Sequence, residues 1–515
     1  MTLRDLVRRV ARTGGAALLT ASDGAGKREG GVFGDLQRAL LPASLPVLPA
    51  VDLAAGYLPA GEDQTAGGDW FDAVERDGKL LLVVGDVVGH GISAAATMGQ
   101  LRAVLLDHLD TGDPIPVVAT ALDRWARHHR GAYGSTACLV ELDPATGALV
   151  YITAGHPPPL VVAGTGTGSR FLGPSGHGPL GELGQIDVEC EFLADGEVLV
   201  LYSDGLVELP GTTPMIGTVN LARAAQEAVA GRLLPAVALP RASERVARYL
   251  IERLVRSRGH TDDVTVLAVQ RREPAPGLIL DAVTDEAGVV ARFRTALLRW
   301  LVPLGVRTDD LDALVHVVGE LVQNVVDHAY EDGPPGPVRL RAALEPDGAT
   351  VVVADDGIWT DALPTAGRGL GLAMVKALAD RSEIVGGKAG TTVTVRHRLH
   401  RDVRLWWLPD VPPRAQVAAA ADVWNDTGPA GPRVGASGLL DTAAAEALAA
   451  ALAINTGPNH GPVTLDLRDV TLLGSAGVQT ILRARAATPD LRIIAPAGSV
   501  AQHVLTLAAI PFATE

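Results

Sequence analysis

Four short acidic turns occur along the first half of the chain, and each lies beside an apolar run typical of a β-strand. Glycines flank most of the carboxylates, where minimal side chains favour tight turns. If these strands share a sheet, one end of it gathers several carboxylates. Carboxylate oxygens suit hard divalent cations such as Mg²⁺ or Mn²⁺, and two such ions close together can activate water for attack on a phosphate ester. The acidic residues are Asp69, Asp86, Asp204, Asp262 and Asp263.

A lone acidic turn is usually only a turn, but this set has a distinctive order and spacing. It is joined by the sequence Leu-Gln-Arg-Ala-Leu-Leu-Pro at 36–42 and by Ala-Gly-His-Pro-Pro around His156. From about 36 to 269 the chain therefore resembles the PPM-type metal-dependent protein serine/threonine phosphatases, in the bacterial branch typified by stage II sporulation protein E. The resemblance implies a phosphatase that needs two Mn or Mg ions.

The resemblance also implies roles for individual residues. Asp86 would be the central catalytic carboxylate that bridges both ions, and the backbone carbonyl of Val87 would be a further ligand. Eukaryotic relatives carry a His, thought to protonate the leaving group, where this chain has Val88; His90 could replace it, although a loop-placing role suits it better. Arg38, in the helix ending Leu-Leu-Pro, would be a regulatory residue. The other expected metal ligands are Asp69, Asp204 and Asp262, with Asp263 competing for the last place.

Composition limits the classes of protein to consider. With 515 residues the chain is too long for one core and suggests three domains. Its net charge of −15 argues against a nucleic-acid binder, which would show a basic face. Two cysteines give neither a disulfide framework nor a zinc pattern. No apolar run approaches a membrane span or a signal peptide, so a cytoplasmic protein without a membrane partner is expected.

The pattern of apolar runs predicts an α+β multidomain protein. Expected strands in the first part lie at 80–84, 138–142, 149–152, 198–202 and 264–269, with helices at 92–109 and 242–256. The sequence after 400 is rich in proline and predicts irregular structure over 401–435. The predicted division is a helical lead-in at 1–35, a phosphatase β-sandwich flanked by helices at 36–272, a second domain at 278–400 and a third at 415–515.

The second domain carries a set of polar residues typical of a nucleotide site. Glu320 and Asn324 are four apart in a helical pattern at 309–329, so they share a helix face. Asp355 and Gly357 follow a strand, and glycines that let backbone N–H groups approach phosphates open a later helix. These helix-opening glycines are Gly367, Gly369 and Gly371, and Thr391 leads the final strand.

This ordered set resembles the GHKL ATPases, specifically the short anti-sigma-factor serine kinases, with an α/β sandwich fold. The resemblance implies ATP and Mg as cofactors, with Glu320 as catalytic base, Asn324 as Mg ligand and Asp355 as adenine anchor. The glycines and Thr391 would line the nucleotide site. The family pattern after Asp355 has a second glycine that is Trp359 here, so ATP binding is expected and ATP turnover stays open.

The sequence of the third domain predicts the order strand–helix–strand–helix, and Ser475 lies where a loop leads into a helix. A Ser at a helix N-cap is usually structural. The domain nevertheless resembles the STAS anti-sigma-factor antagonists, an α/β fold in which the Ser after an Asp is phosphorylated. Ser475 occupies that position, but Gly474 replaces the Asp. A phosphate there would add negative charge and could block docking of a kinase.

Together the three resemblances imply a fused, partner-switching regulator of an alternative sigma factor. The phosphatase would act on a phosphorylated STAS domain in cis or in trans, and the partners would be a sigma factor and that antagonist. The oligomeric state stays open and a homodimer is compatible with it. A non-catalytic scaffold is the alternative. A sensor histidine kinase fits less well, because His316 and His328 lie in or beside the Asn-bearing helix and not on a preceding one.

Overall fold

The chain forms two compact units. The described part of the first unit is Ser44–Leu53 with Arg272–Asp402, and the second comprises Ala54–Arg271 and Val403–Glu515 with the end of Arg28–Ala43. We call 54–271 with 403–405 the sandwich domain, 44–53 with 272–402 the middle domain and 422–514 the C-terminal domain. The computed structural model describes residues 37, 39–60, 67–232, 241–255, 260, 262–331, 333–358, 370–405, 422–428, 431–440, 442–455, 462–473, 475–497, 499–508 and 510–514, so the predicted lead-in at 1–35 lies outside the described residues.

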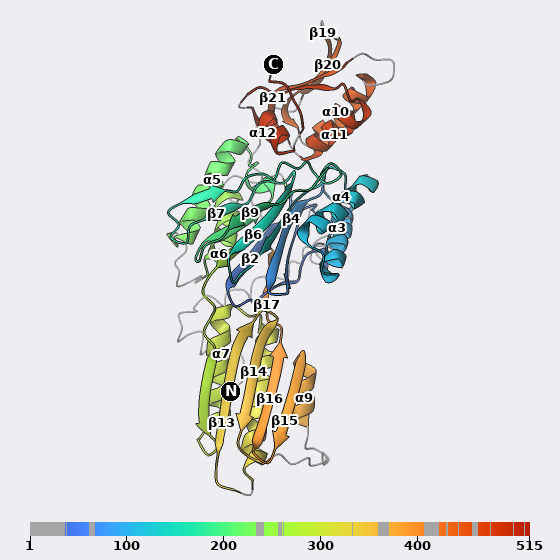
Figure 1. The fold of residues 1–515 in the computed structure, drawn as a ribbon. Coiled ribbons are helices and arrows are strands. Elements are labelled where there is room, and N and C mark those ends of the chain that lie inside the picture. The colour runs from blue at the N-terminus through green and yellow to red at the C-terminus, as the bar shows by residue number, and fades with distance from the viewer. Residues whose placement is uncertain are drawn as a thin grey trace. The chain divides into compact units, whose positions relative to one another are not determined.

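The sandwich domain consists of two sheets, ordered β3-β4-β5-β6-β9 and β18-β2-β11-β10-β7-β8. β4 and β10 are apolar and almost wholly buried, because the facing sheet covers one side of each and helices the other. Helices α3 and α4 flank the first sheet, and α5 and α6 flank the second (Figure 1). The strands are β2 (Val51–Leu58), β3 (Trp70–Arg76), β4 (Lys79–Asp86), β5 (Thr136–Leu142), β6 (Ala148–Ala154), β7 (Leu160–Val162), β8 (Ser169–Phe171), β9 (Glu189–Phe192), β10 (Val198–Tyr202), β11 (Val264–Arg271) and β18 (Arg404–Leu405); the helices are α3 (Ile92–Asp110), α4 (Ile115–His128), α5 (Pro214–Val229) and α6 (Ala242–Leu250), which continues as a π-helical turn (Ile251–Val255).

The β3–β4 hairpin explains how two distant acidic residues meet. Asp77 and Gly78 form its two-residue turn with positive φ angles of 52° and 79°, a geometry that Asp-Gly sequences favour. The turn fixes the register in which Trp70 pairs with Gly85. Asp69, just before β3, and Asp86, at the end of β4, therefore lie at the same end of the sheet.

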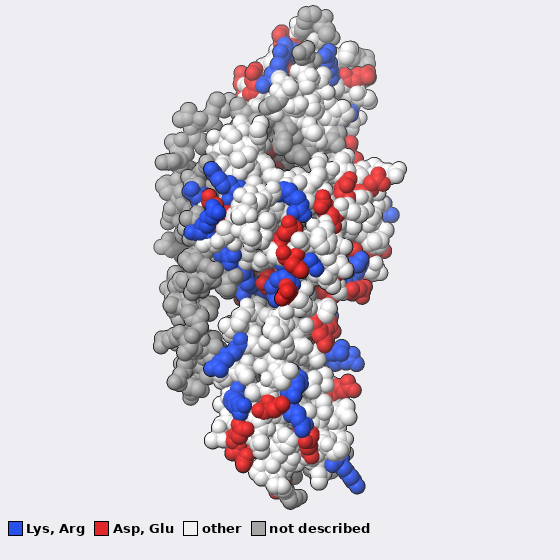
Figure 2. All heavy atoms as spheres, turned by 60° about the vertical axis from the view of Figure 1, so that its left-hand side comes forward, with Lys and Arg blue, Asp and Glu red and all other residues white. Residues whose placement is uncertain are grey.

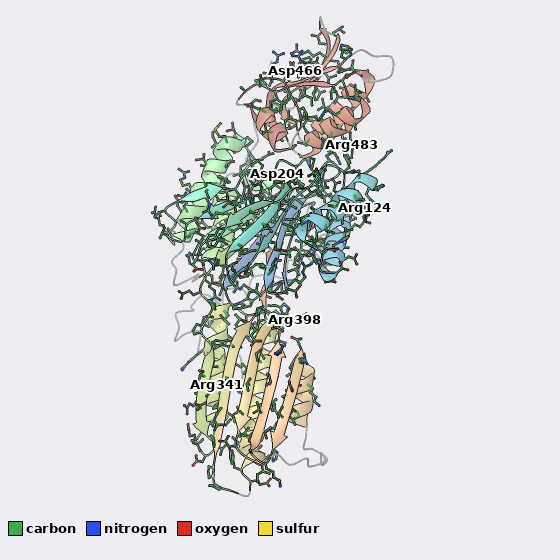
Figure 3. All side chains as sticks on the ribbon, in the orientation of Figure 1. Arg124, Asp204, Arg341, Arg398, Asp466 and Arg483 are labelled. Carbon is green, nitrogen blue, oxygen red and sulfur yellow. The ribbon has the colours of Figure 1, made fainter. Side chains whose placement is uncertain are left out.

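The middle domain is a five-stranded antiparallel sheet in the order β12-β13-β14-β16-β15, with helices α7, α8 and α9 packed on one face. The opposite face carries Arg341, which is labelled in Figure 3 and pairs with Asp281 at 2.6 Å. β1 and β17 pair as a separate two-stranded sheet. The elements are β1 (Ser44–Pro46), β12 (Leu278–Val283), α7 (Val289–Leu301), α8 (Thr308–Asn324) with a π-helical turn (Val325–Ala329), β13 (Pro337–Glu345), β14 (Gly348–Asp355), α9 (Leu370–Leu378), β15 (Arg381–Gly387), β16 (Gly390–His397) and β17 (His400–Asp402).

The C-terminal domain has a sheet in the order β19-β20-β21-β22 around its own apolar core. The expectation of irregular structure over 401–435 is wrong for the described residues of that range, because β17, β18, β19 and the start of β20 lie there, while 406–421 and 429–430 lie outside the described residues. Pro432 misled the prediction; it is the second residue of β20, where the missing N–H is tolerated. The elements are β19 (Asp422–Gly428), β20 (Gly431–Leu440), α10 (Thr442–Asn455), β21 (Thr464–Leu473), α11 (Ser475–Ala487), β22 (Arg492–Ile494) and α12 (Val500–Leu507).

The observed sheets and helices confirm the predicted α+β multidomain class. Figure 2 shows acidic and basic side chains interspersed on the visible face, without a continuous basic band. Within the described ranges, every helix is too short or too polar to span a bilayer.

Candidate metal centre and nucleotide site

The acidic residues of the four turns gather at one end of the sandwich. Asp69 and Asp86 lie at the shared end of β3 and β4. Asp204 follows β10 and Asp262 precedes β11, and these two strands are antiparallel neighbours, so their turns also share an end. The two sheets are joined there by Thr265, whose hydroxyl donates to Oδ2 of Asp69 at 2.9 Å. The structure thus places the predicted carboxylates around one site.

The carboxylate of Asp263 accepts hydrogen bonds from backbone N–H groups of two other segments at this site. Its Oδ1 accepts from the N–H of Ala60 at 2.6 Å, and its Oδ2 accepts from the N–H of Gly68 at 2.8 Å. The side chain is buried, and a Cβ built on Gly67 would lie 1.9 Å from Oδ2. Both oxygens are therefore occupied by neutral donors. In the described part of the chain, Asp262 accepts a backbone hydrogen bond only from the N–H of its neighbour Asp263, at 2.8 Å, so it is the freer candidate for a metal ligand.

The carbonyl of Val87 lies against the turn before β3. The N–H of Val87 donates to the carbonyl of Gly68 at 3.2 Å. A Cβ on Gly68 would lie 2.2 Å from the Val87 oxygen, so only glycine allows this approach. Val87 itself is buried. The arrangement holds the Val87 carbonyl close against the backbone of the turn that carries Asp69.

Burial and mutual repulsion raise the pKa of these carboxyl groups. Burial and then the charges of neighbouring aspartates raise the pKa of Asp69 and Asp86 well above the ordinary value. Burial raises the pKa of Asp204 to about 6, and burial with the charge of Asp204 raises that of Asp262 to about 8. The group is thus an unneutralised acidic cluster that is costly to ionise by itself.

The cluster fits divalent cations. Among the described residues no Lys or Arg forms an ion pair with these aspartates, so no cationic side chain in that part of the chain balances their charge. No three of the described His, Cys, Asp and Glu side chains converge tightly enough to enclose one ion by themselves. Mg²⁺ and Mn²⁺ are commonly held by one or two carboxylates with several waters, and Asp69, Asp86, Asp204 and Asp262 could hold a pair in that way.

His156 is a buried neutral link between two strands of this site. Its Nδ1 accepts from the hydroxyl of Thr136 at 2.8 Å, and its Nε2 donates to the carbonyl of Tyr202 at 3.1 Å. Burial lowers the pKa of His156 to about 4, so the ring is neutral at pH 7. Thr136 pairs with Asp86, and Tyr202 lies two residues before Asp204. His156 therefore fixes the strand ends that carry both aspartates.

Two polar residues that the sequence analysis missed lie at the site. Glu208 is one helical turn after Asp204, and burial with the charges of Asp204 and Asp262 raises its pKa well above the ordinary value. An acid four residues after an acid was the available signal. Gln37 is buried and accepts from the N–H of Gly67 at 3.0 Å, a contact that no local pattern could reveal. The predicted regulatory residue Arg38 lies outside the described residues.

The nucleotide residues of the middle domain are only partly described. Glu320 and Asn324 lie half-buried on one face of α8, whose helix continues as a π-helical turn, a feature common at functional sites. Oδ1 of Asp355 accepts from the N–H groups of Gly357 at 2.9 Å and of Thr391 at 3.3 Å. These contacts join the ends of β14 and β16. Of the other predicted residues, Gly371 lies in α9, while Gly367 and Gly369 lie outside the described residues.

Comparison with known proteins decides the family. Residues 76–272 match the family Stage II sporulation protein E (SpoIIE), and residues 283–397 match the Histidine kinase-like ATPase domain. The crystal structure of the RsbU and RsbW domains of Rv1364c from Mycobacterium tuberculosis superposes with a TM-score of 0.63 and 37% identity, over 72% of this chain and 98% of that one. This chain belongs to the RsbU–RsbW family. It carries a SpoIIE-type PPM phosphatase domain and an anti-sigma kinase-like domain.

Two curated relatives match one domain each of this RsbU–RsbW chain. Phosphoserine phosphatase RsbP of Bacillus subtilis is 29% identical over 135 residues, which is 25% of this chain and 33% of RsbP. Anti-sigma F factor of Clostridium beijerinckii is 25% identical over 120 residues, which is 21% of this chain and 84% of that protein. The chain therefore matches about a third of the curated phosphatase.

Proposed function

We propose that the sandwich domain is a Mn- or Mg-dependent protein serine/threonine phosphatase. The observation that carries the proposal is the buried acidic cluster, which gathers from four turns and has no cationic partner among the described side chains. The membership of residues 76–272 in the SpoIIE family supports the same reaction.

The chain's own residues would prepare the site for a phosphate ester. Asp86 and Asp69 would hold the cations on the first sheet, and Asp204 and Asp262 on the second. A bound pair of cations supplies the activation of water and offsets the phosphate charge. Asp263 holds the turn before β3 against the turn before β11, and neutral His156 links the ends of β5 and β10 by hydrogen bonds.

The substrate we propose is the phosphoserine of a STAS-type anti-sigma-factor antagonist. Supporting this, the C-terminal domain has the mixed sheet and helices of an α/β domain, with Ser475 as the first residue of α11. The middle domain would bind ATP with Mg through Asn324 and Asp355, with Glu320 as the base if it turns ATP over. Its partners would be a sigma factor and the antagonist, in a partner-switching regulator.

The test is hydrolysis of a phosphoserine protein substrate with added Mn. We expect Asp86→Asn to lose at least about a hundredfold in kcat, because the central charge is removed. Asp77→Asn is the matched control: it neutralises an exposed Asp on the same hairpin at a positive φ that Asn tolerates. Equal rates for Asp86→Asn and wild type would overturn the metal assignment, and an inactive wild type would favour the scaffold alternative.

A further inference from the structure

Basic side chains crowd the end of helix α4, where the sequence runs Arg-Trp-Ala-Arg-His-His-Arg over 124–130. Every Arg and His of this run is exposed, and the helix itself ends at His128. The chain as a whole carries a net charge of −15. A basic cluster on so acidic a chain needs a physical cause.

Part of the run stabilises the end of α4. Positive side chains near the C-terminus of a helix interact favourably with its dipole. Arg127 pairs with the buried carboxylate of Asp123 one turn earlier. The Nδ1 atoms of His128 and His129 each lie 2.7 Å from a backbone carbonyl oxygen of the preceding turn. These three basic side chains therefore serve the helix itself.

Three arginines of the same region have no such role. Arg124 is exposed on α4, and Arg130 is exposed just after its end. Their guanidinium groups, and that of Arg485 on helix α11, form no hydrogen bond or ion pair with any described residue. By contrast, Arg339 and Arg341 on the sheet of the middle domain each pair with an Asp. The charges of the first three arginines are therefore available to another molecule.

Helix α11, in the same compact unit as α4, brings its arginines to this region. Nη2 of Arg483 donates to the carbonyl of Arg130 at 3.3 Å. Burial raises the pKa of Tyr133, whereas the charges of Arg127 and Arg485 lower it, so both guanidinium groups lie near that hydroxyl. We call the five basic residues around Tyr133 the arginine patch, of which Figure 3 labels the first and the fourth: Arg124, Arg127, Arg130, Arg483 and Arg485.

The arginine patch lies beside aromatic rings and has few acidic neighbours. Trp125 and Tyr133 are both half-buried, and the Trp125 ring stacks on a histidine of α4 at 3.9 Å between centroids. Among the described residues, the bonded carboxylates here are Asp123, which pairs with Arg127, and Glu182, which accepts from the Tyr133 hydroxyl. Arg, Trp and Tyr are the residue types enriched at the centres of protein–protein interfaces. The composition of this surface is therefore that of an interface with an excess of positive charge.

We infer that the arginine patch is a docking surface for an acidic segment of a partner polypeptide. Guanidinium groups bind carboxylates through two parallel hydrogen bonds, and charged pairs at an interface fix orientation and partner choice. A nucleic acid is the poorer match, because its dense phosphate charge needs a longer basic surface and the chain as a whole is acidic. The inference is independent of the proposed phosphatase and ATP sites.

The patch draws on two domains, which gives docking there a structural consequence. Besides the bond from Arg483 to Arg130, Nε2 of Gln479 on α11 donates to the carbonyl of Tyr133 at 2.5 Å. An acidic segment that paired with Arg124 and Arg485 together would therefore bridge α4 and α11. Binding should then reinforce the contact between the sandwich and C-terminal domains.

The experiment uses the full chain and a fluorescein-labelled peptide of about ten residues that alternates Glu with Ser, followed by fluorescence anisotropy. We expect binding that weakens at least about fivefold as NaCl is raised from about 50 to about 200 mM. Arg124→Glu combined with Arg130→Glu and Arg485→Glu should weaken low-salt binding at least about tenfold, because three attractive charges become repulsive. This variant keeps Arg483 and so leaves its bond to Arg130 in place.

The matched control combines Arg223→Glu, Arg299→Glu and Arg398→Glu. These arginines are also exposed, on α5, on α7 and just after β16, so the net charge changes equally while the arginine patch is intact. The control should keep the wild-type affinity within about twofold. Thermal unfolding of both variants monitors the fold.

The outcomes separate the inference from its rivals. An equal loss of affinity in both triple variants would reveal a mere effect of net charge and would overturn the docking surface, as would a wild type that does not bind the peptide at low salt. If the reversed variant unfolds, Arg124→Gln with Arg130→Gln and Arg485→Gln makes the same comparison, with an expected loss of about threefold. A labelled DNA duplex that binds more tightly than the peptide, and is lost with the patch, would assign the surface to a nucleic acid instead.

Discussion

The backbone N–H of Gly68 donates a 2.8 Å hydrogen bond to Oδ2 of Asp263, so the turn before β11 holds the turn before β3. The two turns lead into strands of different sheets of the sandwich. Both oxygens of the Asp263 carboxylate accept backbone hydrogen bonds that hold the acidic site together. Its neighbour Asp262 is therefore the one available to the acidic cluster. This division of labour between adjacent aspartates gives a direct test.

Asp262→Asn and Asp263→Asn should fail in different ways. Loss of the Asp262 charge should weaken metal binding, so activity should recover as Mn is raised. In Asp263→Asn an NH₂ group replaces one of the two accepting oxygens and points at a backbone N–H, so one hydrogen bond is lost. This should lower the free energy of unfolding by about 1–3 kcal/mol, and added Mn should not restore the activity. Mn titrations of activity and urea unfolding of both variants check this; the reverse pattern would exchange the two roles.

The raised pKa values of the cluster predict how metal-free protein responds to pH. Unfolded Asp titrates near pH 4, whereas burial and repulsion raise the folded pKa of Asp204 to about 6 and of Asp262 to about 8. The folded state binds these protons more tightly, so their stabilising contribution is complete at low pH and is lost as pH rises through about 6 and 8. Thermal unfolding in EDTA should give a Tm that falls over this window.

Added Mn provides the control for that measurement. Cations take the place of the bound protons, so the fall in Tm with pH should shrink or reverse when Mn is present. Asp262→Asn, which cannot ionise, should flatten the upper part of the curve in EDTA. A metal-free Tm that rises between pH 6 and 8 would show that other groups dominate.

His156 should behave in the opposite sense. Its folded pKa of about 4 lies below the unfolded value, so its stabilising contribution is present at neutral pH and is lost as pH falls through about 4. His156→Ala leaves the Tyr202 carbonyl and the Thr136 hydroxyl without their partner, which should cost about 2 kcal/mol or more in urea unfolding at pH 7. His90→Ala, at an exposed position, should stay within about 0.5 kcal/mol of wild type.

The strands that the sequence predicts well are those buried on both faces. β4 reads as an uninterrupted apolar run because the facing sheet and helices both cover it, and its bounds extend the predicted 80–84 by one or two residues. Helices α4 and α5 were not identified. Pro116 and the two valines that follow make the start of α4 resemble a strand, whereas a proline in the first helical turn is well tolerated.

Some residues of the candidate site could likewise be predicted from the sequence, and others could not. Glycines beside Asp69 and Asp86 mark turns locally, so composition and spacing could locate the carboxylates. The choice between Asp262 and Asp263 could not be made, because neighbouring residues differ only in their tertiary partners, Ala60 and Gly68. Contacts that join distant segments, such as Gln37 with Gly67, leave no periodic signal in the chain.

The middle domain should bind ATP with Mg, and Asp355 should determine the affinity. Its Oδ1 already accepts from Gly357 and Thr391, which holds the carboxylate at the ends of β14 and β16 in a fixed position for an amino group of adenine. Isothermal titration should show binding that Asp355→Ala and Asn324→Ala each weaken at least about tenfold. Gln323→Ala, at an exposed neighbour of Asn324, is the control. An absence of heat with wild type would leave this domain as a protein-docking module.

The last prediction joins the kinase-like domain with the phosphatase. If the middle domain transfers the γ-phosphoryl group of ATP to Ser475 and the sandwich domain removes it, Asp86→Asn protein given ATP and Mg should accumulate phosphate there, and wild type should not. The position favours this, since Ser475 is the first residue of α11 and negative charge is stabilised near a helix N-terminus. Intact-mass and peptide mass spectrometry decide the matter, with Asp86→Asn plus Asn324→Ala as the control that should remain unmodified. In Asp86→Asn protein nothing on the chain would remove phosphate from Ser475, so phosphate added by the middle domain would persist. An unmodified Ser475 in such protein, with ATP binding intact, would therefore mean that the middle domain does not phosphorylate it.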